Sequence, residues 1–104
     1  MIRLKVSEIA HAVNGRVVGD GDLEVEAGVE IDSRLIKPGF LFVAKPGEQT
    51  DGHNFAGAAI EAGASALLVE RELDVNVPQV VVADVVVALG LLATEVLRRL
   101  RETS

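Results

Sequence analysis

The chain has 104 residues, the size of a single domain, and its formal net charge of −6 disfavours nucleic acid and anionic membrane surfaces as partners. The absence of cysteine excludes a disulfide framework, a thiol nucleophile and a zinc–thiolate site. Aromatic residues make up only 3% of the chain, so Val, Leu, Ile and Ala must build the core, and base stacking on exposed rings is disfavoured.

The first quarter of the chain predicts a short helix and two short strands. Ser7 is a plausible N-cap for a helix over residues 8–13, and Asn14-Gly15 is expected to end it, because glycine accepts the left-handed backbone of a helix C-terminus. Residues 16–18 and 23–25 are predicted strands on either side of a Gly-Asp-Gly-Asp turn. This arrangement predicts a small hairpin.

Residues 29–55 contain two apolar runs, each followed by a polar, glycine-containing loop. Residues 29–31 alternate in polarity and indicate a short edge strand. Pro38-Gly39 is a turn signal, and the continuous apolar run over residues 40–44 is typical of a strand that is covered on both faces. The segment between these strands is short for a parallel crossover, so the direction of their pairing stays open.

A strand–helix–strand unit follows. Asn54 or Asp51 is expected to cap a helix that runs to Ala62 and is stopped by Gly63, and residues 66–69 are the next strand. The predicted apolar face of this helix comprises Phe55, Ala58, Ala59 and Ala62.

The last quarter predicts a strand over residues 80–82 and a long helix, capped by Asp84, that runs to about Arg101. Its apolar stripe is expected to comprise Val85, Leu89, Leu92, Val96 and Leu100. Charged and polar residues interrupt the apolar run over residues 80–97, so no membrane insertion is expected. Together these elements predict an α/β fold: a small, mostly parallel sheet with a βαβ unit, flanked by helices, plus the N-terminal helix and the small hairpin.

Asp32-Ser33-Arg34 follows the first of the two apolar runs. A guanidinium suits phosphate or carbonyl oxygens, and a serine hydroxyl suits the edge of a nucleobase. The alternative, which this tripeptide alone favours, is a structural ion pair between Asp32 and Arg34.

The second loop, residues 45–53, is a candidate anion cradle. Gly47 allows backbone N–H groups to converge, and Lys45, Gln49 and Thr50 add donors. An ordinary solvated loop is again the favoured alternative, and the phosphate-binding pattern GxxxxGK[ST] does not occur in the chain. Asp51 and His53 lack a nucleophile or second base at a suitable spacing, so we expect a helix cap and a locally packed histidine, with no catalytic and no metal site.

Joined together, these fragments closely resemble the N-terminal domain of the Mur ligases, the ATP-dependent enzymes that build the peptidoglycan stem peptide. The resemblance rests on Asp32-Ser33-Arg34, Pro38-Gly39-x-Leu41-Phe42-Val43-Ala44, Gly47-Glu48-x-x-Asp51-Gly52-His53-x-Phe55 and Gly63-Ala64. Within the family, the N-terminal helix and residues 88–93 favour the branch that adds D-alanyl-D-alanine. The branch that adds the third stem residue is the alternative.

The resemblance implies that this domain holds the UDP moiety of UDP-N-acetylmuramoyl-tripeptide. The residues implied to meet uridine and diphosphate are Ile31, Ser33, Glu48, Gln49 and Thr50. Glu48 is expected to contribute through its backbone N–H, because its carboxylate repels phosphate. The residues expected to shape the loops are Asp32, Arg34, Lys45, Gly47, Asp51 and His53.

The resemblance also implies a domain organisation. Residues 1–104 correspond to the UDP-substrate-binding domain, without the central ATPase domain and the C-terminal domain that complete the enzyme. ATP and Mg²⁺ are then expected to act in the full-length, cytoplasmic bacterial enzyme, and this chain alone is expected to be inactive. A non-enzymatic interaction module is the remaining alternative.

Overall fold

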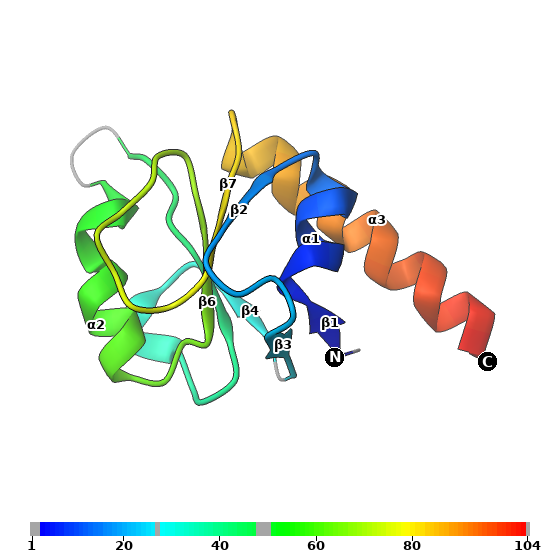
Figure 1. The fold of residues 1–104 in the computed structure, drawn as a ribbon, viewed down its shortest axis with the longest axis horizontal. Helices are drawn as coiled ribbons and strands as arrows, with labels where there is room; N and C mark the ends of the chain where they lie inside the picture. The colour runs from blue at the N-terminus through cyan, green and yellow to red at the C-terminus, as the bar shows by residue number, and fades with distance from the viewer. Residues whose placement is uncertain (1–2, 27, 48–50, 104) are drawn as a thin grey trace.

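The protein folds around a five-stranded sheet that is covered by helices on both faces (Figure 1). The computed structural model describes residues 3–26, 28–47 and 51–103. Strands β4 to β7 are parallel, and β2 is antiparallel to β7 at one edge, which confirms the predicted α/β class with a mostly parallel sheet. In spatial order the strands are β2 (Arg16–Val18), β7 (Gln79–Val81), β6 (Ala66–Val69), β5 (Leu41–Val43) and β4 (Val29–Glu30).

The sheet separates two hydrophobic cores. Helix α2 (Ala56–Glu61) covers one face, and α1 (Val6–Val13) and α3 (Val85–Thr103) cover the other (Figure 1). In β5, Leu41 and Val43 belong to the core with α1 and α3, whereas Phe42 belongs to the core with α2. Successive side chains of a strand point to opposite faces, so the continuous apolar runs supply both cores.

The predicted hairpin between residues 16–18 and 23–25 is wrong. Instead, β2 pairs with β7, and β3 (Glu24–Val25) pairs with β1 (Leu4–Lys5) in a separate two-stranded sheet. The pairing of β2 satisfies the backbone groups along the free edge of the buried strand β7, which a local hairpin would leave open. Non-local pairing of this kind leaves little trace in the sequence.

Strands β4 and β5 are parallel, with Val29 opposite Leu41, which decides the question that the sequence left open. The connection fits because it is compact: it contains the short 3₁₀ helix η1 (Ser33–Leu35) and the turn at Gly39, whose φ is 90°. Ile36 is buried in the core on the α2 side and anchors the crossover there. Parallel pairing places the loops after β4 and β5 at the same edge of the sheet.

The C-terminal end of α1, at Val13, is as predicted, but its N-terminal end differs. The helix begins at Val6, with Lys5 rather than Ser7 at the cap position, and the carboxylate of Glu8 accepts a hydrogen bond from the Lys5 N–H at 2.9 Å. At the C-terminus Asn14, with φ of 56°, takes the left-handed conformation expected of Gly15. Gly15 is required for another reason: a Cβ there would lie 2.5 Å from Val80 Cγ1.

The apolar face predicted for the helix before Gly63 is confirmed only at Ala59. Residues 52–55 form a 3₁₀ helix, η2 (Gly52–Phe55), and α2 begins only at Ala56. The tighter 3₁₀ turn rotates the face, so Ala56 and Ala59 are buried, whereas Phe55, Ala58 and Ala62 are exposed. Gly63 ends the helix as expected, with φ of 113°.

The long helix α3 agrees with its predicted cap. Asp84 Oδ1 accepts the N–H groups of Val86 and Val87 at 2.9 and 3.2 Å. Val85 and Leu92 are buried, but Leu100 is exposed, because the last turns run past the sheet (Figure 1).

Strand β7, which precedes α3, begins one residue earlier than predicted, at Gln79. The buried side-chain amide of Gln79 accepts a hydrogen bond from the Leu73 N–H and donates one to the Leu73 carbonyl. Within the described residues, no helix is long and apolar enough to span a bilayer.

Candidate functional site

A groove of about 680 Å³ lies beside the end of β4, between the loop at residues 31–34 and the start of α2. Ile31 and Phe55 leave 51% and 42% of their surfaces exposed, so the groove offers apolar walls to a ligand. Ser33 also lines the groove and has a hydroxyl that can donate and accept hydrogen bonds. The residues that line the groove are Ile31, Asp32, Ser33, Arg34, Phe55 and Ala58.

Asp32 and Arg34 form a local ion pair at the rim of this groove. Asp32 Oδ1 accepts from Arg34 Nε at 3.0 Å, and Oδ2 accepts from Arg34 Nη2 at 2.8 Å. The Arg34 backbone N–H also donates to Asp32 Oδ1 at 3.0 Å, which caps the 3₁₀ helix that carries Ser33. The pair thus fixes the conformation of the loop, and it neutralises the cation that would otherwise attract an anion.

This ion pair predicts an unusually acidic aspartate. The side-chain and backbone hydrogen bonds from Arg34 lower the pKa of Asp32 to about 2. Because the folded-state pKa lies below that of the unfolded chain, the contribution of the pair to stability is present above about pH 4 and is lost as the pH falls through about 2. We expect ¹³C NMR of the Asp32 carboxyl to titrate near pH 2 in the folded protein. Arg34→Ala is expected to return the midpoint toward about 3.9, and an unchanged midpoint would contradict this assignment.

Asp51 and His53 form a second constellation, beyond the end of β5. Asp51 Oδ1 accepts the backbone N–H of His53 at 3.0 Å and lies 2.6 Å from His53 Nδ1, while Oδ2 accepts from Arg71 Nη1 at 2.9 Å. The backbone N–H of His53, its imidazole and the Arg71 guanidinium hold the pKa of Asp51 well below its usual range. Asp51 therefore remains an anion at neutral pH, and it caps η2 rather than serving as a proton donor.

Of the remaining sequence-predicted residues, Lys45 and Gly47 are exposed in the loop after β5. The Lys45 carbonyl accepts the Gly52 N–H at 2.9 Å, so the two ends of this loop are joined by their backbones. Glu48, Gln49 and Thr50 lie outside the described residues. The groove thus brings Ile31 and Ser33 together, whereas Lys45, Gly47, Asp51 and His53 are not among its lining residues.

Sequence reasoning missed four residues of these constellations. Phe55 and Ala58 line the groove because the 3₁₀ turn rotates them out of the core. Glu70 and Arg71 hold His53 and Asp51, respectively, from the end of β6. The second pair had a signal in the sequence: polar residues directly after a buried strand lie at its carboxyl end, where parallel sheets place their sites.

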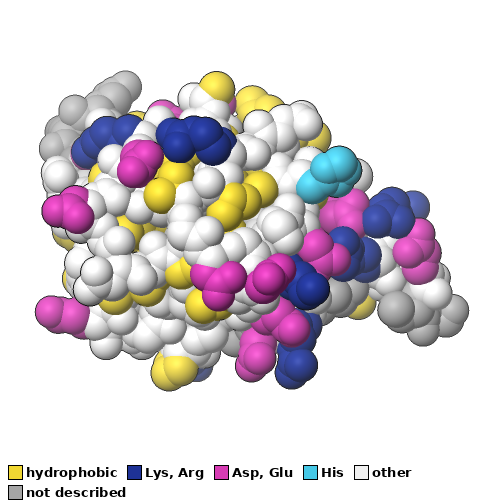
Figure 2. Space-filling view, viewed as in Figure 1, with side chains coloured by type: hydrophobic (Ala, Val, Ile, Leu, Met, Phe, Trp, Pro, Cys, Tyr) yellow, Lys and Arg dark blue, Asp and Glu magenta, His cyan; other side chains and the backbone are white. Residues whose placement is uncertain are grey.

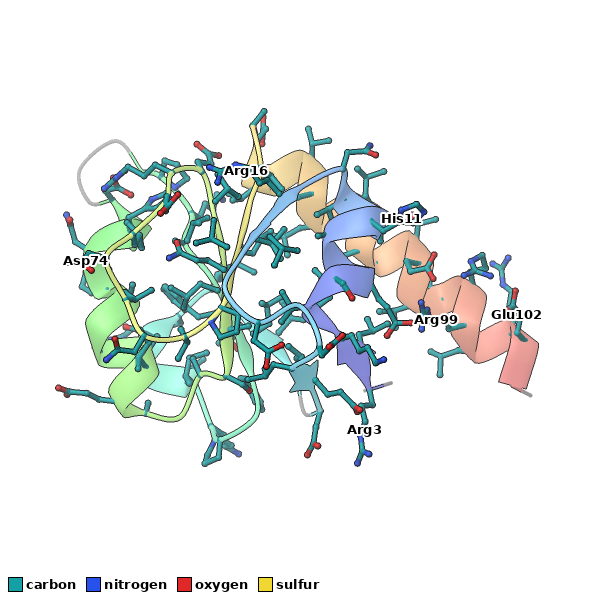
Figure 3. The ribbon with its side chains drawn as sticks, viewed as in Figure 1. Arg3, His11, Arg16, Asp74, Arg99 and Glu102 are labelled. Atoms are coloured by element: carbon teal, nitrogen blue, oxygen red, sulfur yellow. The ribbon has the colours of Figure 1, made fainter. Side chains whose placement is uncertain are left out.

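A separate hollow of about 410 Å³ lies between α1 and α3 and is lined mainly by charged side chains. Arg99 bridges the helices, donating to Glu8 at 3.1 Å and to Glu95 at 2.7 Å, and Figure 3 shows it beside α1. Figure 2 shows acidic and basic side chains interleaved toward this end of the molecule. Because the charges neutralise one another, this hollow is a helix–helix contact rather than an anion site. Among the described residues, no group of three or more His, Asp or Glu could hold a metal ion.

Comparison with known proteins adds a family signal. The family described as "Mur ligase family, catalytic domain" matches residues 27–97. The chain is 44% identical over 93 residues to the UDP-N-acetylmuramoyl-tripeptide–D-alanyl-D-alanine ligase of Escherichia coli. It is 42% identical over 95 residues to the UDP-N-acetylmuramoyl-L-alanyl-D-glutamate–2,6-diaminopimelate ligase of Bacteroides fragilis. These matches cover 89% and 88% of the chain, but only 20% and 19% of those relatives.

The fold also matches solved structures. A MurF crystal structure from Acinetobacter baumannii superposes with a TM-score of 0.79 at 31% identity, covering 88% of this chain and 20% of that one. MurF from Thermotoga maritima in complex with ADP gives a TM-score of 0.60 at 33% identity, covering 64% of this chain and 16% of that one. The chain therefore spans about a fifth of the length of the relatives that it matches.

Proposed function

Because this chain belongs to the Mur ligase family, with the fold of a MurF N-terminal domain, we propose that it binds the UDP moiety of UDP-N-acetylmuramoyl-tripeptide. In this role it serves an ATP-dependent ligase that adds D-alanyl-D-alanine in bacterial peptidoglycan synthesis. The observation that carries the proposal is the groove at the end of β4, which is lined by Ser33 and by two exposed apolar side chains, Ile31 and Phe55. A pyrimidine ring has the matching chemistry, with apolar faces and a polar edge.

In this proposal the groove binds the uridine, and the loop after β5 binds the diphosphate. Ile31 and Phe55 offer apolar contact to the base, and Ser33 offers a donor and an acceptor to its edge or to the ribose. The diphosphate is assigned to residues 48–50, with the Glu48 backbone N–H as donor and Lys45 as a nearby exposed cation. The net charge of −6 opposes an anionic ligand, so these local donors must supply its affinity.

Catalysis is proposed to require more than this chain. The sequence has no GxxxxGK[ST] loop for ATP, and the described residues contain no metal-ligand cluster for Mg²⁺. In the full-length cytoplasmic enzyme, ATP and Mg²⁺ would activate the stem-peptide carboxylate, and the central and C-terminal domains would supply those sites. In this proposal the chain contributes substrate binding and does not catalyse the reaction alone.

A diaminopimelate-adding ligase of the MurE type is the second candidate, because ligases of that specificity are 38% to 51% identical to this chain over the residues that match. Both candidates would bind UDP in the same way, and they differ in the peptide to which the UDP sugar is attached. An interaction module without nucleotide affinity is the alternative of a different class.

We test the proposal by titrating the ¹⁵N-labelled chain with UDP and with UDP-N-acetylmuramoyl-tripeptide. Amide shifts are expected at residues 31–34 and 51–55, with weak affinity, since these 104 residues span only about a fifth of the length of the relatives. Ser33→Ala removes the hydroxyl in the groove and is expected to weaken binding roughly fivefold to tenfold, the effect of about 1 kcal/mol.

Ser7→Ala is the matched control, because it removes the same hydroxyl from α1, away from the groove. No shifts at millimolar UDP would refute the assignment and favour an interaction module, for which analytical ultracentrifugation would then report self-association. Equal effects of the two serine substitutions would remove Ser33 from the site.

A further inference from the structure

His53 is a buried imidazole with both of its ring nitrogens committed. Its side chain is 0% exposed, and its Nε2 accepts the backbone N–H of Glu70 at 2.9 Å. A nitrogen that accepts this bond carries no proton, so the hydrogen resides on Nδ1, which donates to Asp51 Oδ1 at 2.6 Å. The contacts therefore fix one neutral tautomer of the ring.

The two partners of His53 belong to different parts of the sheet edge. Asp51 lies in the loop after β5 and is also held by Arg71 Nη1 at 2.9 Å. Glu70 lies directly after β6, and its Oε2 accepts the N–H of Val85, the first residue of α3, at 2.9 Å. Through His53, the loop after β5 is thus tied to the end of β6 and to the start of α3.

We propose that His53 is a positioning residue for UDP binding, which in its neutral Nδ1–H form holds residues 51–53, at the end of the loop after β5, against the end of β6. This inference rests on the proposed UDP-binding function and assigns to His53 no contact with the ligand. The ring contacts the Asp51 carboxylate and the backbone N–H of Glu70; the Arg71 guanidinium is paired with Asp51, and the Glu70 carboxylate accepts the Val85 N–H. A protonated ring would set an Nε2–H against the Glu70 N–H, two donors face to face, and would break the link to β6.

Two substitutions separate the halves of this link. His53→Asn retains an N–H donor near the position of Nδ1 but removes the acceptor for Glu70. His53→Gln retains an acceptor near the position of Nε2 but removes the donor to Asp51. Because residues 51–53 are positioned only when both halves of the link hold, each variant is expected to bind UDP about tenfold more weakly at temperatures where circular dichroism shows it fully folded.

The control is Val13→Ala, which opens the core between α1 and α3 and lowers stability without touching the loop. It is expected to bind UDP like the unmodified chain, which separates positioning from general destabilisation. A ligand-free measurement adds a direct signature. Hydrogen exchange of the Glu70 N–H is expected to accelerate in His53→Asn and to stay close to the unmodified rate in His53→Gln.

The outcomes are distinct. If the unmodified chain binds UDP and both folded His53 variants bind it equally well, the positioning role is refuted while the proposed function stands. If the unmodified chain does not bind UDP, the proposed function fails and the positioning role fails with it. ¹⁵N NMR of the His53 ring that shows an Nε2–H tautomer would also overturn the inference.

Discussion

Replacing Gly63 with alanine is expected to lower the free energy of unfolding by about 3 kcal/mol, which corresponds to a fall in Tm of more than about 10 °C. Gly63 ends α2 with φ of 113°, a conformation that residues with a Cβ rarely adopt. A Cβ there would also lie 2.7 Å from Pro38 Cα and 2.9 Å from Pro38 N. Backbone strain and overlap therefore act together, at the point where the turn before β5 lies against the end of α2.

Gly57→Ala is the matched control for this prediction. It adds the same methyl group six residues earlier, inside α2, where nothing lies within 4 Å of the new Cβ. Alanine is the better helix former, so this variant is expected to be more stable by about 0.5 to 1 kcal/mol. Thermal unfolding followed by circular dichroism measures both. If Gly63→Ala unfolds at the temperature of the unmodified chain, the contact between Gly63 and Pro38 is not a constraint in solution.

The elements that were predicted well are those whose signals are local. The Asp84 cap and the start of α3 follow from a single side chain and its neighbours. Residues 66–69 were predicted as a strand with the observed bounds, because an apolar run between Gly63 and polar residues has few alternatives. Local chemistry of this kind is readable without knowledge of the rest of the fold.

The elements that were predicted wrongly depend on distant partners or on backbone geometry. Residues 16–18 pair with a strand more than sixty residues away rather than with their nearest neighbour. The face of α2 was shifted by a 3₁₀ turn, which turned Phe55 from an expected core residue into a wall of the groove. The sequence indicated both loops of the candidate site, but only the parallel pairing of β4 with β5 places them at one edge.

Among the substitutions considered, Gly52→Ala is expected to lower UDP affinity the most. A Cβ at residue 52 would lie 2.6 Å from both the N and the O of Lys45, at the point where the two ends of the loop are joined. The Gly52 N–H donates to the Lys45 carbonyl at 2.9 Å, so the added methyl group must push these backbones apart and break that bond. We expect a loss of about 2 to 3 kcal/mol in stability and a loss of more than about tenfold in UDP affinity.

The reason for the double effect is that Gly52 lies between Asp51 and His53. Displacing it moves the carboxylate that caps η2 and the imidazole that reaches Glu70, so the loop loses its links to Arg71 and β6 together. Gly57→Ala again serves as the control, and it is expected to leave UDP binding unchanged because it lies outside both constellations. Denaturant unfolding and UDP titration measure the two effects separately. If the Gly52→Ala chain is destabilised but binds UDP normally, the backbone contact between Gly52 and Lys45 does not determine UDP affinity.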